Sequence, residues 1–217
     1  MFEIAYEQII GTRKEQEDYF ATFHFDDGDL IILADGMGGY KGGKIASSCV
    51  VKSVIDSLKN CSDDIHYCFE NAMYKAQKDL KNIIAQDQSL DKMGCTLIIT
   101  LITNEKIIWL SVGDSLIYLK RDEKLKIVNK LHAVDNILTS AICKEDIIEF
   151  EYKQMPLQKN DILLVCSDGI QTLDTNEILK TLDQKTSKMI VSTLIENIQI
   201  KNSSHQDNTT ILVLKEK

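Results

Sequence analysis

The sequence predicts an α/β (α+β) sandwich of mostly antiparallel sheets covered by helices. Short apolar runs with strand-like alternation fill the start and the middle of the chain. Two segments with helical periodicity separate these groups, and two more precede a last strand-like run. This grouping differs from the regular alternation of strand and helix that builds a parallel doubly wound sheet.

The predicted strands are short and rich in Ile, Leu and Val. They cover residues 2–9, 19–25, 30–34, 95–103, 106–110, 116–120, 124–128, 147–152, 161–166 and 209–214. Apolar residues recur at helical spacing over residues 43–58, 63–85, 176–182 and 187–198, which predicts four helices. Ser62 is the expected N-cap of the second helix, with Asp63 and Asp64 in its first turn.

The composition predicts a single soluble domain over residues 1–217. Lys and Arg number 25 against 33 Asp and Glu, so the formal net charge is −8, and 44% of the residues are hydrophobic. That length is enough to bury a sizeable core. The negative charge and the scattered basic residues argue against nucleic acid or an anionic membrane surface as the main partner. We expect a monomer without a secretory signal or a membrane span.

Six cysteines occur without a CxxC pair, and several lie within apolar runs. We therefore expect reduced thiols that pack as small hydrophobic residues, and a cytoplasmic location. The four histidines are far apart and lack the spacing of zinc ligands. A metal ion, if this protein binds one, must be held by carboxylates.

Aspartates recur at the ends of predicted strands. They are Asp18, Asp35, Asp114, Asp168 and Asp207. A single Asp beside a Gly is usually a turn residue. Five in similar positions predict a shared site, because the ends of strands bring distant parts of a chain together. Clustered carboxylates suit Mg²⁺ or Mn²⁺, which prefer oxygen ligands.

Six short motifs occur in order along the chain. They are RKEQED at residues 13–18, DGMGG at 35–39, GCT at 94–96, VGDS at 112–115, SDGI at 167–170 and DNTT at 207–210. Together they resemble the motifs of the PP2C-type (PPM) metal-dependent protein serine/threonine phosphatases, in a compact bacterial form. The resemblance runs from about residue 11 to residue 214, and it implies a four-layer α-β-β-α sandwich with two central, mostly antiparallel sheets flanked by helices.

The resemblance implies a set of metal ligands. Asp35 matches the carboxylate that bridges two metal ions, and Gly36 matches the glycine whose carbonyl binds one of them. The remaining direct ligands match Asp18, Asp168 and Asp207. The implied cofactors are two Mn²⁺ or Mg²⁺ ions per chain.

Three further positions carry implied roles. Glu17 matches a residue that acts through metal-bound water, and Asp114 matches an aspartate at a third metal position in bacterial members. Arg13 matches the arginine that grips the substrate phosphate. Without the motif, a surface ion pair with Glu15 or Glu17 explains this arginine equally well.

The implied function is metal-dependent hydrolysis of phosphoserine and phosphothreonine in proteins, in opposition to a Ser/Thr kinase. Two cations about 3.5–4 Å apart lower the pKa of a bridging water, which becomes a nucleophile aligned for in-line attack. A guanidinium offers a planar fork of donors that matches phosphate oxygens. The expected catalytic residues are therefore Arg13, Asp35 and Asp168.

Several positions depart from the family pattern. Met37 stands where many eukaryotic members have a histidine thought to act as general acid, although bacterial members commonly have methionine. Leu116 replaces the usual arginine, and Cys95 replaces a common threonine. The flap that most bacterial members insert after residues 132–136 is largely missing, which leaves open both the choice of substrate and the role of Asp114.

Two other functions stay open at this point. Residues 38–44 fit the GxxxxGK pattern of a phosphate-binding loop, but Ile45 stands where Ser or Thr should bind Mg²⁺. Nucleotide hydrolysis is therefore one alternative. The other is a catalytically weak phosphoprotein-binding module of the same fold, against which the full set of aspartates argues.

Overall fold

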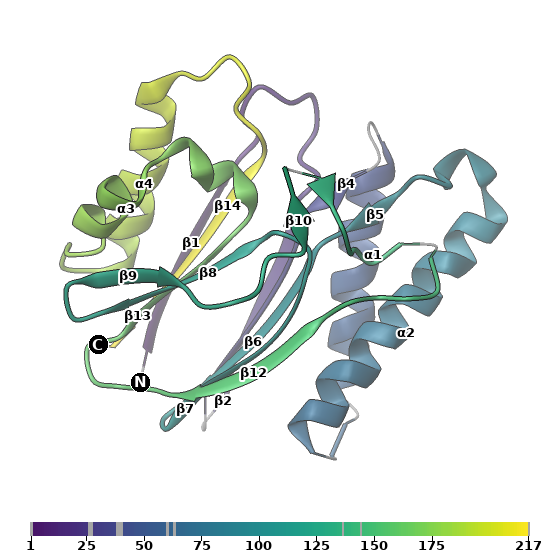
Figure 1. The fold of residues 1–217 in the computed structure, drawn as a ribbon, viewed down its shortest axis with the longest axis horizontal. Helices are drawn as coiled ribbons and strands as arrows, with labels where there is room; N and C mark the ends of the chain where they lie inside the picture. Colours follow the sequence, from purple (N-terminus) through teal and green to yellow (C-terminus); the bar gives the residue numbers. More distant parts are fainter. Residues whose placement is uncertain are drawn as a thin grey trace.

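The computed structural model describes residues 2–25, 28–37, 41–59, 61–62, 64–135, 137–143 and 145–216. Two five-stranded sheets pack face to face and form the inner layers (Figure 1). Helices α1 (Lys41–Leu58) and α2 (Ile65–Gln86) cover one sheet, and α3 (Thr175–Thr181) and α4 (Ser187–Lys201) cover the other. The predicted four-layer sandwich is confirmed.

The first sheet has the strand order β1-β14-β13-β8-β9, and all its neighbouring pairs are antiparallel. Its strands are β1 (Phe2–Ile9), β8 (Leu116–Arg121), β9 (Lys124–Ile127), β13 (Ile162–Cys166) and β14 (Thr209–Glu216). Phe2 pairs with Glu216, and Ile9 pairs with Thr209. The residues that follow Ile9 therefore meet those that precede Thr209, at the end of the sandwich away from the chain termini (Figure 1).

The second sheet has the order β12-β7-β6-β3-β2 and is also antiparallel throughout. Its strands are β2 (Tyr19–Phe25), β3 (Gly28–Ala34), β6 (Leu97–Thr103), β7 (Lys106–Val112) and β12 (Glu151–Pro156). Strand β3 is buried from Asp29 to Ala34 because α1 packs on one of its faces and the first sheet on the other. Its apolar run is therefore continuous, not alternating.

Three hydrophobic layers hold the sandwich together. One lies between the sheets and includes Leu33, Trp109 and Leu212. The second lies under α1 and α2, and the third lies under α3 and α4. No helix within the described ranges combines the length and apolar character needed to cross a bilayer.

The predicted elements are confirmed with two corrections of position. The predicted strand 95–103 is divided at Thr96 into β5 (Gly94–Cys95) and β6, and β5 pairs with the short strand β4 (Gly36–Met37). The predicted strand 147–152 is wrong in its first half, since β12 begins at Glu151. The apolar Ile147 that suggested a strand there is 89% exposed.

The connection between α1 and α2 differs from expectation in two ways. The prediction of reduced thiols is wrong for Cys61 and Cys68, which form a disulfide across a sequence separation of 7. The N-cap of α2 is Asp64, not Ser62, because the Asp64 side chain accepts a hydrogen bond from the His66 backbone N–H. Asp63 lies outside the described residues.

Candidate active site

Strand pairing brings Asp18 and Asp35 together. Asp18 precedes β2 and Asp35 follows β3, and the pairing of Tyr19 with Ala34 makes the two aspartates neighbours. The carboxyl group of Asp35 contacts those of both Asp18 and Asp168. Asp35 therefore lies close to two other carboxyl groups at this end of the sheet.

The first sheet contributes two more aspartates to the same place. Asp168 follows β13 and Asp207 precedes β14, and these strands pair Cys166 with Ile211. Asp114 lies in the turn between β7, in the second sheet, and β8, in the first. All five predicted aspartates therefore gather where the ends of both sheets meet.

Asp18 is a buried residue, with 4% of its surface exposed. Its Oδ2 accepts hydrogen bonds from Ser167 Oγ at 2.8 Å and from Thr210 Oγ1 at 2.7 Å. Ser167 directly follows β13 and Thr210 lies in β14, both at the first sheet. Its Oδ1 is buried without a hydrogen-bond partner. One oxygen of Asp18 is thus fixed by the protein, and the other is left facing the site.

Asp35 is held through its backbone. Its N–H donates to Thr96 Oγ1 at 2.9 Å, and its carbonyl accepts from the Thr96 N–H at 2.9 Å. Thr96 Oγ1 lies 2.8 Å from Ser115 Oγ, beside Asp114. These contacts explain the break between β5 and β6, because Thr96 pairs with Asp35 instead of continuing a strand.

Burial and neighbouring carboxylates raise the pKa values of Asp18, Asp35 and Asp168. Burial raises the pKa of Asp35 well above its usual range, and the charges of Asp18, Asp168, Asp207 and Asp114 raise it further. Burial and the charge of Asp114 raise the pKa of Asp168 to about 6. Burial also raises the pKa values of Asp18 and Asp114. The ionised form of these carboxyl groups is therefore unfavourable, because the surrounding side chains do not compensate its negative charge.

Gly36 and Gly43 let two segments approach each other closely. A Cβ at Gly36 would lie 2.3 Å from the Gly43 carbonyl oxygen, and one at Gly43 would lie 2.7 Å from Glu17 Oε1. Ser47 Oγ donates to the Glu17 carbonyl at 2.5 Å. The start of α1 is thereby packed against Glu17, whose pKa is raised by burial and whose Oε1 has no hydrogen-bond partner.

Arg13 is an exposed residue on the loop between β1 and β2. Its Nη2 lies 2.5 Å from Asp207 Oδ2, and 54% of its side chain is exposed. The alternative ion pairs with Glu15 or Glu17 are not the ones formed. Arg13 thus stands at the rim of the aspartate cluster, in contact with one of its members.

The residues present fit a hard divalent cation by the chemistry of their donors. The side chains gathered here offer oxygen atoms, and two buried carboxylate oxygens, Asp18 Oδ1 and Glu17 Oε1, receive no hydrogen bond. In the part of the chain that the structure describes, no three His, Cys, Asp or Glu side chains already enclose one point. Asp207 is instead turned toward Arg13.

The chain matches known proteins over nearly its whole length. A family model described as protein phosphatase 2C matches residues 10–208. The chain belongs to the protein phosphatase 2C family. It is therefore a metal-dependent protein serine/threonine phosphatase, whose substrates are phosphorylated proteins.

Relatives and solved structures agree with this membership. The serine/threonine phosphatase stp of Listeria monocytogenes is 26% identical over 236 residues, with 94% of this chain and 91% of the relative covered. A putative protein phosphatase of Mycoplasma genitalium is 30% identical, with 93% and 90% covered. The catalytic domain of the phosphatase PstP in complex with two manganese ions has a TM-score of 0.86 at 22% identity, with 99% of this chain and 97% of that chain covered.

In this PP2C protein, the segment where the sequence predicts a reduced flap contains a small hairpin. Strands β10 (Ala133–Val134) and β11 (Ile137–Leu138) pair there, and Ile137 is 71% exposed. The following segment and Met37 line an open groove of about 610 Å³. Met37 packs against Gly94: a Cβ added at Gly94 would lie 2.6 Å from the Met37 Cε.

The phosphate-loop alternative falls partly on residues 38–40, outside the described residues.

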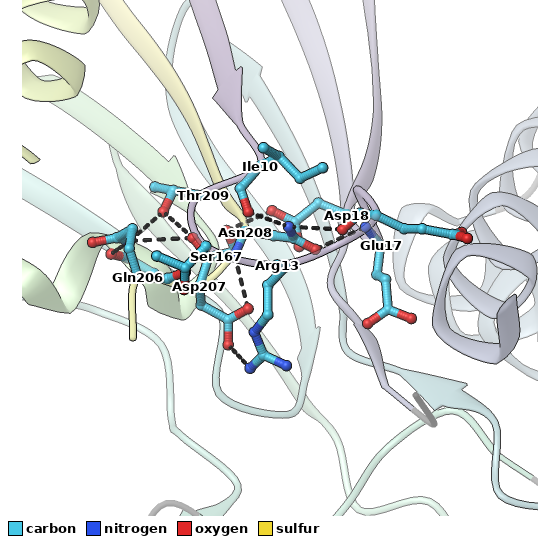
Figure 2. A network of polar contacts seen from close by, with 12 residues as sticks. Ile10, Arg13, Glu17, Asp18, Ser167, Gln206, Asp207, Asn208 and Thr209 are labelled. Carbon is cyan, nitrogen blue, oxygen red and sulfur yellow. Dashed lines mark hydrogen bonds and ion pairs between the residues drawn. The ribbon is translucent and has the colours of Figure 1, made fainter. Parts of the chain in front are cut away.

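The motifs of this phosphatase also contain buried polar residues to which the sequence assigned no role. Ser167 and Thr210 hold the carboxylate of Asp18, and Thr96 holds the backbone of Asp35. Asn208 holds the loop that carries Arg13 (Figure 2). In the sequence, only their position next to predicted metal ligands points to these residues. Their hydrogen-bond partners lie up to 198 residues away, so the sequence does not identify the contacts.

Proposed function

We propose that this chain hydrolyses phosphoserine and phosphothreonine with two divalent cations, Mn²⁺ or Mg²⁺, and opposes a Ser/Thr kinase. In this proposal Asp18, Asp35, Asp168, Asp207 and the Gly36 carbonyl are the direct ligands. The observation that supports it most is the contact of Asp35 with both Asp18 and Asp168, beside a buried Asp18 oxygen without a partner.

The physical reason for a cation is the charge of the cluster. Buried carboxylates that lack a counterion raise one another's pKa and destabilise the fold. When bound, two divalent cations would supply a bridging water of lowered pKa as the nucleophile. The protein's part is to fix the carboxylates, as Ser167 and Thr210 do for Asp18.

Arg13 is the proposed phosphate-binding residue. Its side chain is mostly exposed, and Nη2 contacts one carboxylate oxygen of Asp207. The same guanidinium can donate hydrogen bonds to the phosphate oxygens of a substrate. Arg13 would then orient the monoester and offset negative charge in the transition state. Arg13, Asp35 and Asp168 are thus the proposed catalytic residues.

Two ligand roles are peripheral to this core. We propose that Glu17 acts through water, since its Oε1 is buried beside Gly43 without a partner. Asp114 is the proposed ligand of a third metal ion, because its charge is close enough to raise the pKa values of Asp35 and Asp168.

The same proposal covers the organisation of the protein. We propose one domain over residues 1–217, which acts as a monomer in the cytoplasm. The layer between the sheets supports a single domain, because it joins Leu33 from the first part of the chain with Leu212 from the last.

Phosphatase assays with matched substrates test the proposal. Release of phosphate from a phosphothreonine peptide and from ATP is measured with Mn²⁺, with Mg²⁺ and with chelator, for wild type and Asp35→Asn. Peptide hydrolysis that needs the metal and is lost in Asp35→Asn supports it. Turnover of ATP alone would revive the nucleotide alternative, and silence on both substrates would favour a binding module.

A further inference from the structure

The loop between β1 and β2 has no helix or strand of its own from residue 10 to residue 18, yet it carries Arg13. It is held from one side by the segment before β14 (Figure 2). Thr12 donates to the Gln206 carbonyl twice, from its N–H at 2.8 Å and from its Oγ1 at 3.0 Å. Gly11 adopts φ +64°, and a Cβ there would lie 2.4 Å from the same carbonyl oxygen.

Asn208 is the centre of this arrangement. Its side-chain Nδ2 donates to the Ile10 carbonyl at 2.8 Å and to the Glu15 carbonyl at 3.0 Å. Its Oδ1 accepts from the Glu17 N–H at 2.8 Å. The residue is only 3% exposed. One amide therefore holds the loop before Arg13 and at two points after it.

Asn208 also touches the partner of Arg13. The Asn208 backbone N–H donates to Asp207 Oδ1 at 2.7 Å, and Asp207 Oδ2 receives Arg13 Nη2. The arginine side chain is itself more than half exposed, so packing does little to fix its direction. Its position depends on the backbone of the loop, and the backbone of the loop depends on Asn208.

We propose that Asn208 is a positioning residue that acts through the loop to aim Arg13 at the substrate phosphate. The inference rests on the proposed phosphate-binding role of Arg13. Loss of the amide frees the loop, so that only a fraction of the molecules present Arg13 correctly. Apparent substrate affinity falls by that fraction, and a fraction of about one tenth corresponds to a roughly ten-fold rise in KM.

A double-mutant cycle tests the inference. KM and kcat for a phosphothreonine peptide are measured at saturating Mn²⁺ for wild type, Asn208→Ala, Arg13→Ala and the double variant. We expect Asn208→Ala to raise KM about ten-fold in the wild-type background and less than two-fold in the Arg13→Ala background, because the side chain through which it acts is then absent.

Thr12→Val is a milder variant for the case in which Asn208→Ala does not fold. It removes the hydrogen bond from Thr12 Oγ1 and keeps the one from the Thr12 N–H. Here we expect KM to rise about two- to three-fold, again only where Arg13 is present.

Ser187→Ala is the matched control, since Ser187 is fully buried and its Oγ donates to the Glu3 carbonyl at the far end of β1. It should lower Tm without raising KM.

The outcomes separate this inference from the function on which it rests. An equal rise of KM in both backgrounds, or a fall in Tm and kcat with KM unchanged, overturns the role of Asn208. A rise of KM in Arg13→Ala together with an unchanged KM in Asn208→Ala and Thr12→Val overturns this inference alone. If Arg13→Ala leaves KM and kcat at wild-type values, the proposed role of Arg13 fails, and the inference fails with it.

Discussion

Asp18 Oδ2 lies 2.7 Å from Thr210 Oγ1, although the two residues are 192 positions apart and lie at strands of different sheets. The contact joins the two sheets at the site, since Thr210 belongs to β14 and Asp18 directly precedes β2. Because Thr210 binds Oδ2, the other oxygen of Asp18, Oδ1, is left without a hydrogen bond. In the proposed metal site, this hydroxyl group therefore couples stability to metal binding.

Replacing Thr210 with Val should destabilise the protein. The change keeps the shape and removes a hydrogen bond to a buried carboxylate, which is worth about 1.5–3 kcal/mol in the free energy of unfolding. It also removes the acceptor of Gln8 Nε2. Urea unfolding measures the effect, and Mn²⁺ titration should show weaker binding.

Thr100→Val is a matched control for this experiment. Thr100 is fully buried like Thr210, but its Oγ1 has no hydrogen-bond partner. The free energy of unfolding should stay the same or rise slightly, because the change removes an unsatisfied buried hydroxyl. Equal losses in the two variants would contradict the importance of the Asp18 contact.

Asp35→Asn should have opposite effects on activity and on the stability of the metal-free protein. Activity with Mn²⁺ should fall at least about 100-fold, because the change removes the proposed metal-bridging carboxylate. In chelator the variant should melt at a higher temperature than wild type, because it replaces an ionisable carboxyl group whose ionisation is unfavourable: burial and neighbouring carboxylates raise the pKa of Asp35. Each kcal/mol gained corresponds to about 2–4 °C in Tm.

Differential scanning calorimetry with chelator and with excess Mn²⁺ checks this reversal. Wild type should be the more stable protein in Mn²⁺, since bound metal stabilises the folded state. A lower Tm for Asp35→Asn under both conditions would mean that Asp35 has a structural role only.

His132 should make the protein less stable in mild acid. The residue is 1% exposed, neither ring nitrogen has a hydrogen-bond partner, and burial lowers the pKa of His132 below its usual 6.5. The unfolded chain therefore binds a proton more readily than the folded one. The contribution of His132 to stability is fully present above pH 6.5 and is lost as the pH falls below it.

His132→Phe isolates this contribution. Carboxylates such as Asp168, with its pKa raised to about 6, titrate over the same range with the opposite sign. The measured quantity is therefore the difference in free energy of unfolding between wild type and variant, at pH 7.5 and at pH 5.5. The difference should shift in favour of the variant at pH 5.5, and a constant difference would contradict the prediction.

Reduction of the Cys61–Cys68 disulfide should lower stability and leave activity unchanged. Closing a loop of this length in the unfolded chain corresponds to roughly 2–2.5 kcal/mol. The disulfide follows the end of α1 at Leu58, about 27 Å of helix from its start near the site. Unfolding with and without dithiothreitol measures the effect, and a Cys61→Ser/Cys68→Ser variant should not respond to the reductant. A parallel loss of activity on reduction would contradict the separation of the disulfide from the site.

Much of the fold was predictable because local pattern reports it directly. Strands β1 and β2 have the predicted bounds, since their side chains follow the pleat of a sheet. Continuous runs such as residues 30–34 identified strands covered on both faces. The prediction failed where apolar residues are exposed, as at Ile147, and where a hydroxyl interrupts a strand, as at Thr96.

The sequence by itself determined the order of the elements, the family and the aspartates that gather at the strand ends. Tertiary structure alone decided which atoms meet there: that Arg13 pairs with Asp207, that Thr210 holds Asp18, that Asn208 holds the loop of Arg13, and that Cys61 pairs with Cys68. The physical reason is the distance along the chain over which each feature is determined. Local pattern depends on neighbours within a few residues, whereas these side-chain contacts depend on the register of strands and on how chain segments pack against one another.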